Sequence, residues 1–154
     1  MSGPGRGGRS HRPTLLLAVP SQTSYLAMIS ELTRHMAALA GFDQAVAGRL
    51  ALAVDEAATN AIKHAYAGDP DRLVQLRFDD RTDELRVEIV DTGRTVDPRN
   101  VPQVDLERYV KDRRTGGLGV HLMEKIMDSV TYRRAAGANI CCLVKRKDGS
   151  GGAP

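Results

Sequence analysis

The sequence predicts an α+β fold, a two-layer sandwich in which helices cover one face of a mostly antiparallel sheet. Helical periodicity dominates the first part of the chain after one short apolar strand. Strict alternation of apolar and polar residues then replaces it in two neighbouring segments. A long irregular stretch, one more helix and two more strands follow. This order favours a single sheet with its helices on one side.

Length and composition limit the possibilities. A chain of 154 residues with 42% hydrophobic content suffices for one globular domain. We expect this domain at 14–147, between a disordered basic tail at 1–13 and a flexible tail at 148–154. No apolar run reaches the roughly 20 residues that cross a bilayer, and the N-terminus lacks the apolar stretch of a signal peptide. We therefore expect a cytoplasmic protein with no membrane partner.

The net charge of +3 owes much to the arginine-rich N-terminal tail. A basic tail attracts nucleic acid, but its single Arg-Gly-Gly fragment at 6–8 has no aromatic neighbours to stack on bases. A solubilising tail is favoured, and we expect no direct contact with nucleic acid. Cys141 and Cys142 point to opposite faces of a strand, so we interpret them as small apolar residues, not as a disulfide or a metal site.

The first predicted elements are a strand and a helix. The strand covers Thr14 to Val19 and is closed by Pro20. Ser21 is a candidate N-cap of the helix, and Gly41 is expected to end it. Its apolar positions recur at helical spacing and comprise Tyr25, Met28, Ile29, Leu32, Met36 and Leu39.

A second helix is predicted from an N-cap at Asp43 to about Ala65, before the helix-ending Gly68-Asp69-Pro70. The segments RLVQLRFD (72–79) and ELRVEIVD (84–91) then alternate with period two around a turn-rich connection. They predict a hairpin with one buried face.

The stretch 95–115 shows no period and is long enough to be functional, commonly as a lid. After it, Leu118, Leu122, Met123 and Ile126 predict a helix that ends near Ser129. Two final strands, 130–135 and 139–145, are expected to join at Gly137.

The most informative segment is AVDEAATNAIKHAY (53–66), which predicts one uninterrupted helix. Glu56 and Asn60 lie four residues apart and therefore share a face, with His64 one turn further on. A carboxylate can accept a proton, and an amide oxygen suits a hard cation such as Mg²⁺. Many exposed helix faces carry this pair, so the spacing alone is weak. A structural role at the helix end is favoured for His64.

A second segment is Asp91-Thr92-Gly93 at the end of the second hairpin strand. Strand parity puts Asp91 on the inward face, where a carboxylate needs donors such as the exocyclic amine of adenine. Gly93 would allow backbone to approach a flat ring. An aspartate that only caps a turn is the favoured alternative for this motif taken alone.

A third segment, Thr115-Gly116-Gly117-Leu118-Gly119, begins the helix after the loop. Helix N-termini expose unpaired N–H groups, and glycines let phosphate oxygens come close. Lys111, Arg113 and Arg114 precede it and add positive charge. The motif is neither a P-loop nor a dinucleotide fingerprint. A flexible hinge remains an equal alternative.

Together the segments resemble the Bergerat-type ATP-binding fold of the GHKL class, which gyrase, histidine kinases and MutL share. The runs EAATNAIKHAY, DTGR, GGLGVHLME and MDSVTY resemble the anti-sigma-factor serine/threonine kinases of bacterial partner-switching systems. The resemblance covers roughly Thr14 to Lys147.

The resemblance implies a role for each matching residue. Asn60 matches the magnesium ligand, Glu56 the general base, and Asp91 with Gly93 the adenine-binding pair. The phosphate-binding set comprises Arg114, Thr115, Gly116, Gly117, Leu118 and Gly119. The arginine expected near the γ-phosphate has no clean counterpart, and Arg113, Arg114 and Lys111 are the candidates.

Two positions depart from the family pattern. Thr95 stands where a second glycine normally follows the D-x-G motif, which stiffens the start of the loop. The last strand reads Gly137-Ala138-Asn139 where Gly-Thr is usual. The polar support of the adenine contact therefore comes from Asn139 or does not exist.

The family implies a kinase that uses ATP and Mg²⁺ to phosphorylate a STAS-domain anti-anti-sigma factor. A sigma factor or another regulator is the implied competing partner, and a homodimer is common. The alternative is a nucleotide-gated module that sequesters a regulator without kinase activity. A nucleic-acid-binding protein and a topoisomerase fragment are disfavoured, and so is a histidine kinase, because neither His64 nor His121 suits a phosphoacceptor.

Overall fold

The structure, a computed structural model, describes residues 14–94 and 117–148 and confirms the α+β prediction. The strands are β1 (Leu15–Pro20), β2 (Leu73–Asp80), β3 (Glu84–Asp91), β4 (Ser129–Ala135) and β5 (Ala138–Arg146). The helices are α1 (Leu26–Leu39), α2 (Gln44–Asn60) and α4 (Gly117–Ile126), with a 3₁₀ turn η1 (Thr23–Tyr25) and a π-helical turn η2 (Ala61–Ala65). The predicted N-terminal tail, the predicted loop at 95–115 and the chain after residue 148 lie outside the described residues.

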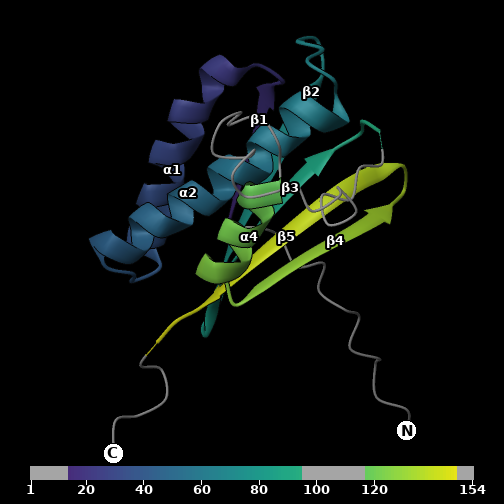
Figure 1. The fold of residues 1–154 in the computed structure, drawn as a ribbon. Helices are drawn as coiled ribbons and strands as arrows, with labels where there is room; N and C mark the ends of the chain where they lie inside the picture. Colours follow the sequence, from purple (N-terminus) through teal and green to yellow (C-terminus); the bar gives the residue numbers. More distant parts are fainter. Residues whose placement is uncertain (1–13, 95–116, 149–154) are drawn as a thin grey trace, which may run out of the picture.

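The strands form one five-stranded sheet in the order β1-β2-β3-β5-β4 (Figure 1). Every neighbouring pair in that order is antiparallel. The central strand β3 pairs with β2 along one edge and with β5 along the other. Asp91, its last residue, therefore lies directly opposite Asn139 of β5.

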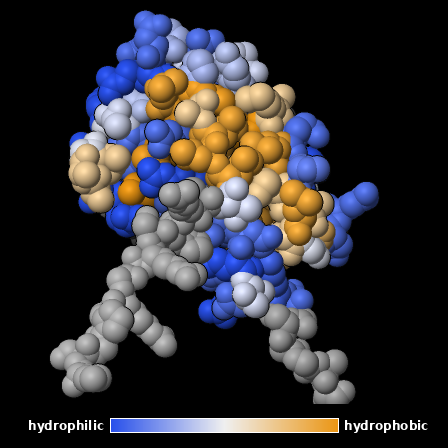
Figure 2. Space-filling model, turned by 180° about the vertical axis from the view of Figure 1, so that it is seen from behind, coloured by the Kyte–Doolittle hydropathy of each residue, from blue (hydrophilic) through white to orange (hydrophobic). Residues whose placement is uncertain are grey.

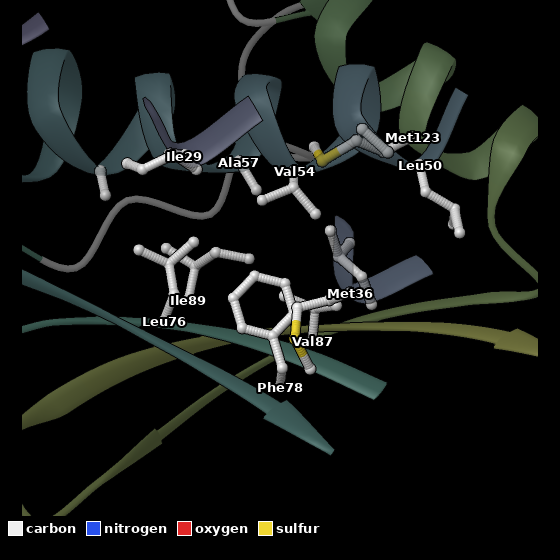
Figure 3. Close-up of a cluster of buried hydrophobic side chains, with 14 of the residues drawn as sticks. Ile29, Met36, Leu50, Val54, Ala57, Leu76, Phe78, Val87, Ile89 and Met123 are labelled. Atoms are coloured by element: carbon white, nitrogen blue, oxygen red, sulfur yellow. The ribbon is translucent and has the colours of Figure 1, made fainter. Parts of the chain in front are cut away.

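The core lies between one face of the sheet and the helices (Figure 3). Alternate residues of β2 and β3 supply the sheet side, as period two requires. On the helix side, α1, α2 and α4 each contribute fully or almost fully buried residues. The labelled members of this cluster are Ile29, Met36, Leu50, Val54, Ala57, Leu76, Phe78, Val87, Ile89 and Met123.

The start of the first helix differs from the prediction. Ser21 continues the path of the strand, because its backbone N–H donates to the carbonyl of Arg72 at 2.7 Å. Its hydroxyl oxygen has no hydrogen-bond partner among the described residues, so Ser21 does not cap the helix. The helical path opens as the 3₁₀ turn η1 and becomes α-helical only at Leu26. Gly41 does end it, with a φ of 98° that favours glycine.

Two predicted apolar positions of α1 are not in the core. Met28 is 45% and Leu39 is 65% exposed, whereas Thr33 is fully buried and donates its hydroxyl to the carbonyl of Ile29. A threonine that bonds back into its own helix can occupy an apolar face. Further exposed apolar residues are Leu16, Leu52 and Leu73. Apolar side chains also gather on the face seen from behind (Figure 2).

The second helix begins as predicted, because the Asp43 carboxylate accepts the N–H of Val46 at 2.9 Å. The prediction of one uninterrupted helix is wrong in its last turn, where α2 ends at Asn60 and the π-helical turn η2 continues. The N–H of Tyr66 bonds the carbonyl of Ala61, five residues back. Single π-helical turns are rare and frequently occur at functional sites.

The last hairpin turns where the sequence predicted. Ala136 and Gly137 both have positive φ, 50° and 77°, which gives the two-residue turn of a tight hairpin. Cys141 and Cys142 occupy adjacent strand positions and form no disulfide. No helix within the described ranges is long and apolar enough to span a bilayer.

Candidate functional site

Asp91 ends β3 on the inward face, as parity predicted, and is 7% exposed. Its Oδ1 atom accepts two hydrogen bonds, from the N–H of Gly93 at 2.9 Å and from Nδ2 of Asn139 at 2.8 Å. No described residue donates to Oδ2. The buried carboxylate therefore keeps one oxygen for a donor that the described protein does not supply.

Asn139 supplies the polar contact that the sequence left open. Its Nδ2 group also lies 3.2 Å from the carbonyl oxygen of Gly93 and 3.0 Å from that of Arg94. Its Oδ1 atom accepts Nη1 of Arg134 at 2.8 Å. Both ends of the amide are thus held.

The segment after Asp91 is fastened to the end of η2. The N–H of Arg94 donates to the carbonyl of Ala65 at 2.8 Å, and its Nη2 donates to the carbonyl of His64 at 3.2 Å. The N–H of Thr92 donates to the Tyr66 hydroxyl at 2.8 Å. Terminal helix carbonyls lack partners within the helix, so this distant segment caps the helix.

Gly93 is required by this contact. A Cβ atom at Gly93 would lie 2.3 Å from the carbonyl oxygen of Ala65 and 2.5 Å from its carbon. Both atoms are backbone and cannot move aside cheaply. The sequence predicted glycine here for contact with a flat ring, and that contact remains a prediction; the structure supplies a packing reason.

Asn60 is the last residue of α2, immediately before the π-helical turn. Its Nδ2 atom is buried and has no hydrogen-bond partner among the described residues. An unpaired buried donor costs free energy, so native structures rarely keep one without a reason. The Nδ2 atom of Asn60 is therefore available to a partner beyond the described residues.

Glu56 lies one turn before Asn60 and is partly buried. Burial raises the pKa of the Glu56 carboxyl above its ordinary value, the nearby Asp55 carboxylate raises it further, and Lys63 opposes both. The pKa of Asp55 is also raised by burial. A carboxylate with a raised pKa is better matched to proton transfer near neutral pH.

The helix and strand motifs meet in space. Gly93 contacts Ala65, which follows Asn60 by five residues on one helical path. At about 1.5 Å per residue, this separation along the helix is about 7.5 Å. The strand-end motif and the end of this helical path are therefore neighbours in space.

The glycine motif is described only in part. Gly117, Leu118 and Gly119 form the first turn of α4, which packs beside α2. Val120 and Met123 anchor that helix in the core. Lys111, Arg113, Arg114, Thr115 and Gly116 lie outside the described residues.

Sequence reasoning did not single out Asp55, and it left the role of Asn139 open. Asp55 adjoins Glu56 and is partly buried in the structure. Nothing in the sequence pattern distinguishes it from an ordinary surface acid. Asn139 could have been found from its register, because it lies opposite Asp91 in the β3–β5 ladder. That register requires the sheet order.

A shallow hollow of about 420 Å³ lies beside this site. Asp91 and Asn60 do not line it. Its walls are Ala65, Tyr66, Ala67, Asp69, Arg72, Thr92, Gly93 and Arg94. Arg72 lies over the Tyr66 ring at 5.1 Å, and its Nη2 donates to the Thr92 carbonyl and hydroxyl.

Within the described ranges, no three His, Cys, Asp or Glu side chains cluster in a way that could hold a metal ion. This finding is compatible with a Mg²⁺ ion bound mainly by substrate phosphates and one amide oxygen.

Comparison with known proteins gives consistent results. Residues 19–145 match the family described as the histidine kinase-like ATPase domain. The chain is 34% identical over 129 residues to Serine-protein kinase RsbW of Bacillus subtilis. That alignment covers 80% of each protein. It is 28% identical over 130 residues to the protein of the same name from Listeria monocytogenes. That alignment covers 82% of this chain and 83% of the relative.

Solved structures share the fold at low identity. One contains the RsbU and RsbW domains of a Mycobacterium tuberculosis protein, with a TM-score of 0.56 and 18% identity over 87% of this chain. This chain spans only 33% of that longer protein. Another is the SiaB–SiaC complex from Pseudomonas aeruginosa, with a TM-score of 0.55 and 12% identity, covering 88% of this chain and 91% of that one.

Proposed function

Because the chain belongs to the histidine kinase-like ATPase domain family and is a protein serine/threonine kinase, we propose that it transfers the γ-phosphoryl group of Mg-ATP to a STAS-domain anti-anti-sigma factor. The observation that carries the proposal is the buried carboxylate of Asp91, which has two donors on Oδ1 and none from the described residues on Oδ2.

Adenine fits this carboxylate. The exocyclic amine of adenine is a donor, and it can reach Oδ2 while Gly93 and Asn139 keep Oδ1 occupied. Guanine presents a carbonyl at the corresponding place, which would set acceptor against acceptor. Asp91 is therefore expected to select ATP over GTP.

Asn60 fits the metal-bound triphosphate. Its partly buried side-chain amide can give Oδ1 to Mg²⁺ and the unpaired Nδ2 to a phosphate oxygen. Bound Mg²⁺ neutralises phosphate charge and stabilises the charge that develops during transfer. The N–H groups in the first turn of α4, at Gly117, Leu118 and Gly119, face no intrahelical acceptor and favour phosphate. Arg114, Thr115 and Gly116 are proposed to extend this phosphate site.

Glu56 is the proposed general base. It shares a helix face with Asn60 and would accept the proton of the substrate hydroxyl as the phosphoryl group departs from ATP. Its raised pKa brings it nearer to the pH at which it must exchange protons.

The partner assignment rests on the relatives' names and on the resemblance. RsbW relatives are named serine-protein kinases, and SiaB was solved in a complex with SiaC. We propose a STAS-domain protein as substrate and a sigma factor or another regulator as the competing partner. A cytoplasmic homodimer is part of the same proposal, and sedimentation analysis tests its stoichiometry.

The deciding experiment incubates the protein with labelled Mg-ATP and a candidate STAS-domain partner. Label is expected on one serine or threonine of the partner, which mass spectrometry identifies. Omission of Mg²⁺ is expected to stop the transfer. ATP binding without any modified partner would instead indicate a nucleotide-gated module.

A further inference from the structure

The hydroxyl of Tyr66 lies between two neighbouring strands at the point where their ladder ends. The register of β2 and β3 ends at the pair Gln75–Val90. Continued along both strands, this register would bring Leu73 opposite Thr92. The Tyr66 hydroxyl instead donates to the carbonyl of Leu73 at 2.6 Å and accepts the N–H of Thr92 at 2.8 Å. It therefore bridges the two backbone groups that a continued ladder would join directly.

The Arg72 side chain also holds Thr92. Its Nη2 donates to the carbonyl oxygen and to the hydroxyl of Thr92, each at 3.1 Å. The guanidinium group of Arg72 lies 5.1 Å from the centre of the Tyr66 ring, where cation and ring attract each other. Thr92 is thus held at its N–H, its carbonyl and its hydroxyl by side chains that follow the second helix.

Tyr66 is itself fixed by the way the helix ends. The residue is 6% exposed and belongs to the core, and its N–H closes the π-helical turn on the carbonyl of Ala61. The next residue, Ala67, has a φ of 51°, which is unfavourable for a residue with a Cβ atom. Such backbone strain persists only where surrounding contacts impose it. The Tyr66 hydroxyl therefore has a defined position.

The bridge determines where the end of β3 lies. A direct ladder bond would bring the Thr92 nitrogen to about 2.9 Å from the Leu73 oxygen, and the inserted hydroxyl keeps these two atoms further apart. The chain then leaves the edge of β2 and turns to the helix end, where Gly93 meets the Ala65 backbone. Thr92 lies between Asp91 and Gly93, so the bridge also sets the position of both.

We propose that Tyr66 is a positioning residue for nucleotide binding, because its hydroxyl holds the end of β3 apart from β2. The inference rests on the proposed function, since it assumes that Asp91 meets the base of Mg-ATP. Without the hydroxyl, the N–H of Thr92 bonds either the Leu73 carbonyl or water, and in both cases Asp91 loses its fixed position. Mg-ATP then binds more weakly, whereas the transfer step at the phosphate end is little affected.

Tyr66→Phe removes only the hydroxyl oxygen and is the main test. Calorimetric titration gives the Mg-ATP affinity, and single-turnover phosphotransfer at saturating Mg-ATP gives the rate of the chemical step. We expect the affinity to fall roughly tenfold, because two hydrogen bonds are lost, and the rate to change less than about twofold. Tyr25→Phe makes the same chemical change in η1, where the residue packs partly against the core. It should leave both quantities unchanged.

Arg72 provides a second test with its own control. Arg72→Ala removes two bonds to Thr92 and leaves the hydroxyl bridge, so we expect a roughly threefold loss of Mg-ATP affinity. Arg133→Ala removes an exposed arginine that pairs with Glu88 at 3.4 Å and should bind Mg-ATP as the wild type does. Thermal unfolding of each variant establishes that it is folded. A purely structural role would lower the melting temperature of Tyr66→Phe without changing its affinity.

The outcomes are distinguishable. If the wild-type protein fails to bind Mg-ATP, or if Asp91→Asn binds it unchanged, the proposed function fails. If both of those tests succeed while Tyr66→Phe keeps the wild-type affinity, or loses rate instead of affinity, the inference about Tyr66 is overturned. If Tyr66→Phe does not fold, an unchanged affinity in Arg72→Ala overturns it instead.

Discussion

The two ends of the candidate site differ in how completely their polar groups are paired. At the end proposed for adenine, the Asp91 carboxylate has two donors and the Asn139 amide is bonded on both sides. At the end proposed for the phosphates, the Asn60 amide has an unpaired buried atom, and burial raises the pKa of Glu56.

This difference indicates a division of labour. Paired groups are held in place and can recognise a base without first rearranging. Unpaired and partly desolvated groups lower stability in the free protein but are available to substrate and metal. We therefore expect changes at the phosphate end to affect chemistry, and changes at the adenine end to affect binding or folding.

The largest effect is expected from Glu56→Gln. Removal of a general base typically lowers the rate about 100- to 10,000-fold, while ATP affinity should change less than about threefold, since glutamine keeps the shape. Single-turnover phosphotransfer with labelled ATP measures the rate. Asp55→Asn, at the neighbouring half-buried acid, is the matched control and should retain most activity. A wild-type rate in Glu56→Gln would remove Glu56 from the mechanism.

Asp91→Asn tests the adenine end. We expect ATP affinity to fall about 10- to 100-fold, because a hydrogen bond to a charged group is lost. GTP should be affected less, since an asparagine amide can donate to its carbonyl. Calorimetry with both nucleotides measures the change. Asp69→Asn, in the hollow beside the site, should leave both affinities alone; equal losses for the two nucleotides would count against base recognition.

Gly93→Ala tests the packing that joins the two ends. The added Cβ overlaps the Ala65 backbone, so we expect a loss of about 1–3 kcal/mol in the free energy of unfolding. Denaturant titration measures it. Gly48→Ala is a suitable control, because its Cβ would meet only the flexible end of Arg34 at 3.1 Å. That variant should be neutral or slightly stabilising. Equal stability of Gly93→Ala and wild type would contradict the packing argument.

The smallest expected effect concerns stability and pH. The folded-state pKa of Glu56 is raised, so the folded protein binds more protons than the unfolded chain between the ordinary and the raised pKa. Stability is thus lost as the pH rises through that window. Glu56→Gln should flatten this dependence and raise the melting temperature near neutral pH by roughly 1–3 °C. Thermal unfolding at several pH values tests this. If the melting temperature of Glu56→Gln depends on pH as that of the wild type does, ionisation of Glu56 does not destabilise the fold.

Much of the fold could be predicted because its signals are local. The alternation of apolar and polar residues predicted β3 at the residues that the structure assigns to it. Gly137 predicted the final hairpin turn, and its φ is positive in the structure. The cap at Ser21 was predicted wrongly, because its N–H pairs with the Arg72 carbonyl, about fifty residues away, and the helical path begins only at Thr23. The buried face predicted for α1 from its apolar residues is slightly rotated from the observed one. Thr33 lies on the observed face because its hydroxyl bonds to a carbonyl of the same helix.

The candidate site was predicted as residue types and not as contacts. Sequence spacing identified Glu56, Asn60 and Asp91, but no spacing rule indicates that Gly93 meets the Ala65 backbone. The π-helical turn after Asn60 also has no local signature, because it depends on how the helix end is held. Such features follow from the assembled sheet and helices.

The cap on the end of η2 has a consequence for local opening. Arg94 donates its backbone N–H to the carbonyl of Ala65, so this amide belongs to the cooperative unit of the second helix, although it lies beyond the third strand. In native-state hydrogen exchange, the Arg94 amide should exchange with the protection of that helix. Solvent access at one backbone position would then report whether the helix carrying Asn60 and the strand carrying Asp91 come apart together.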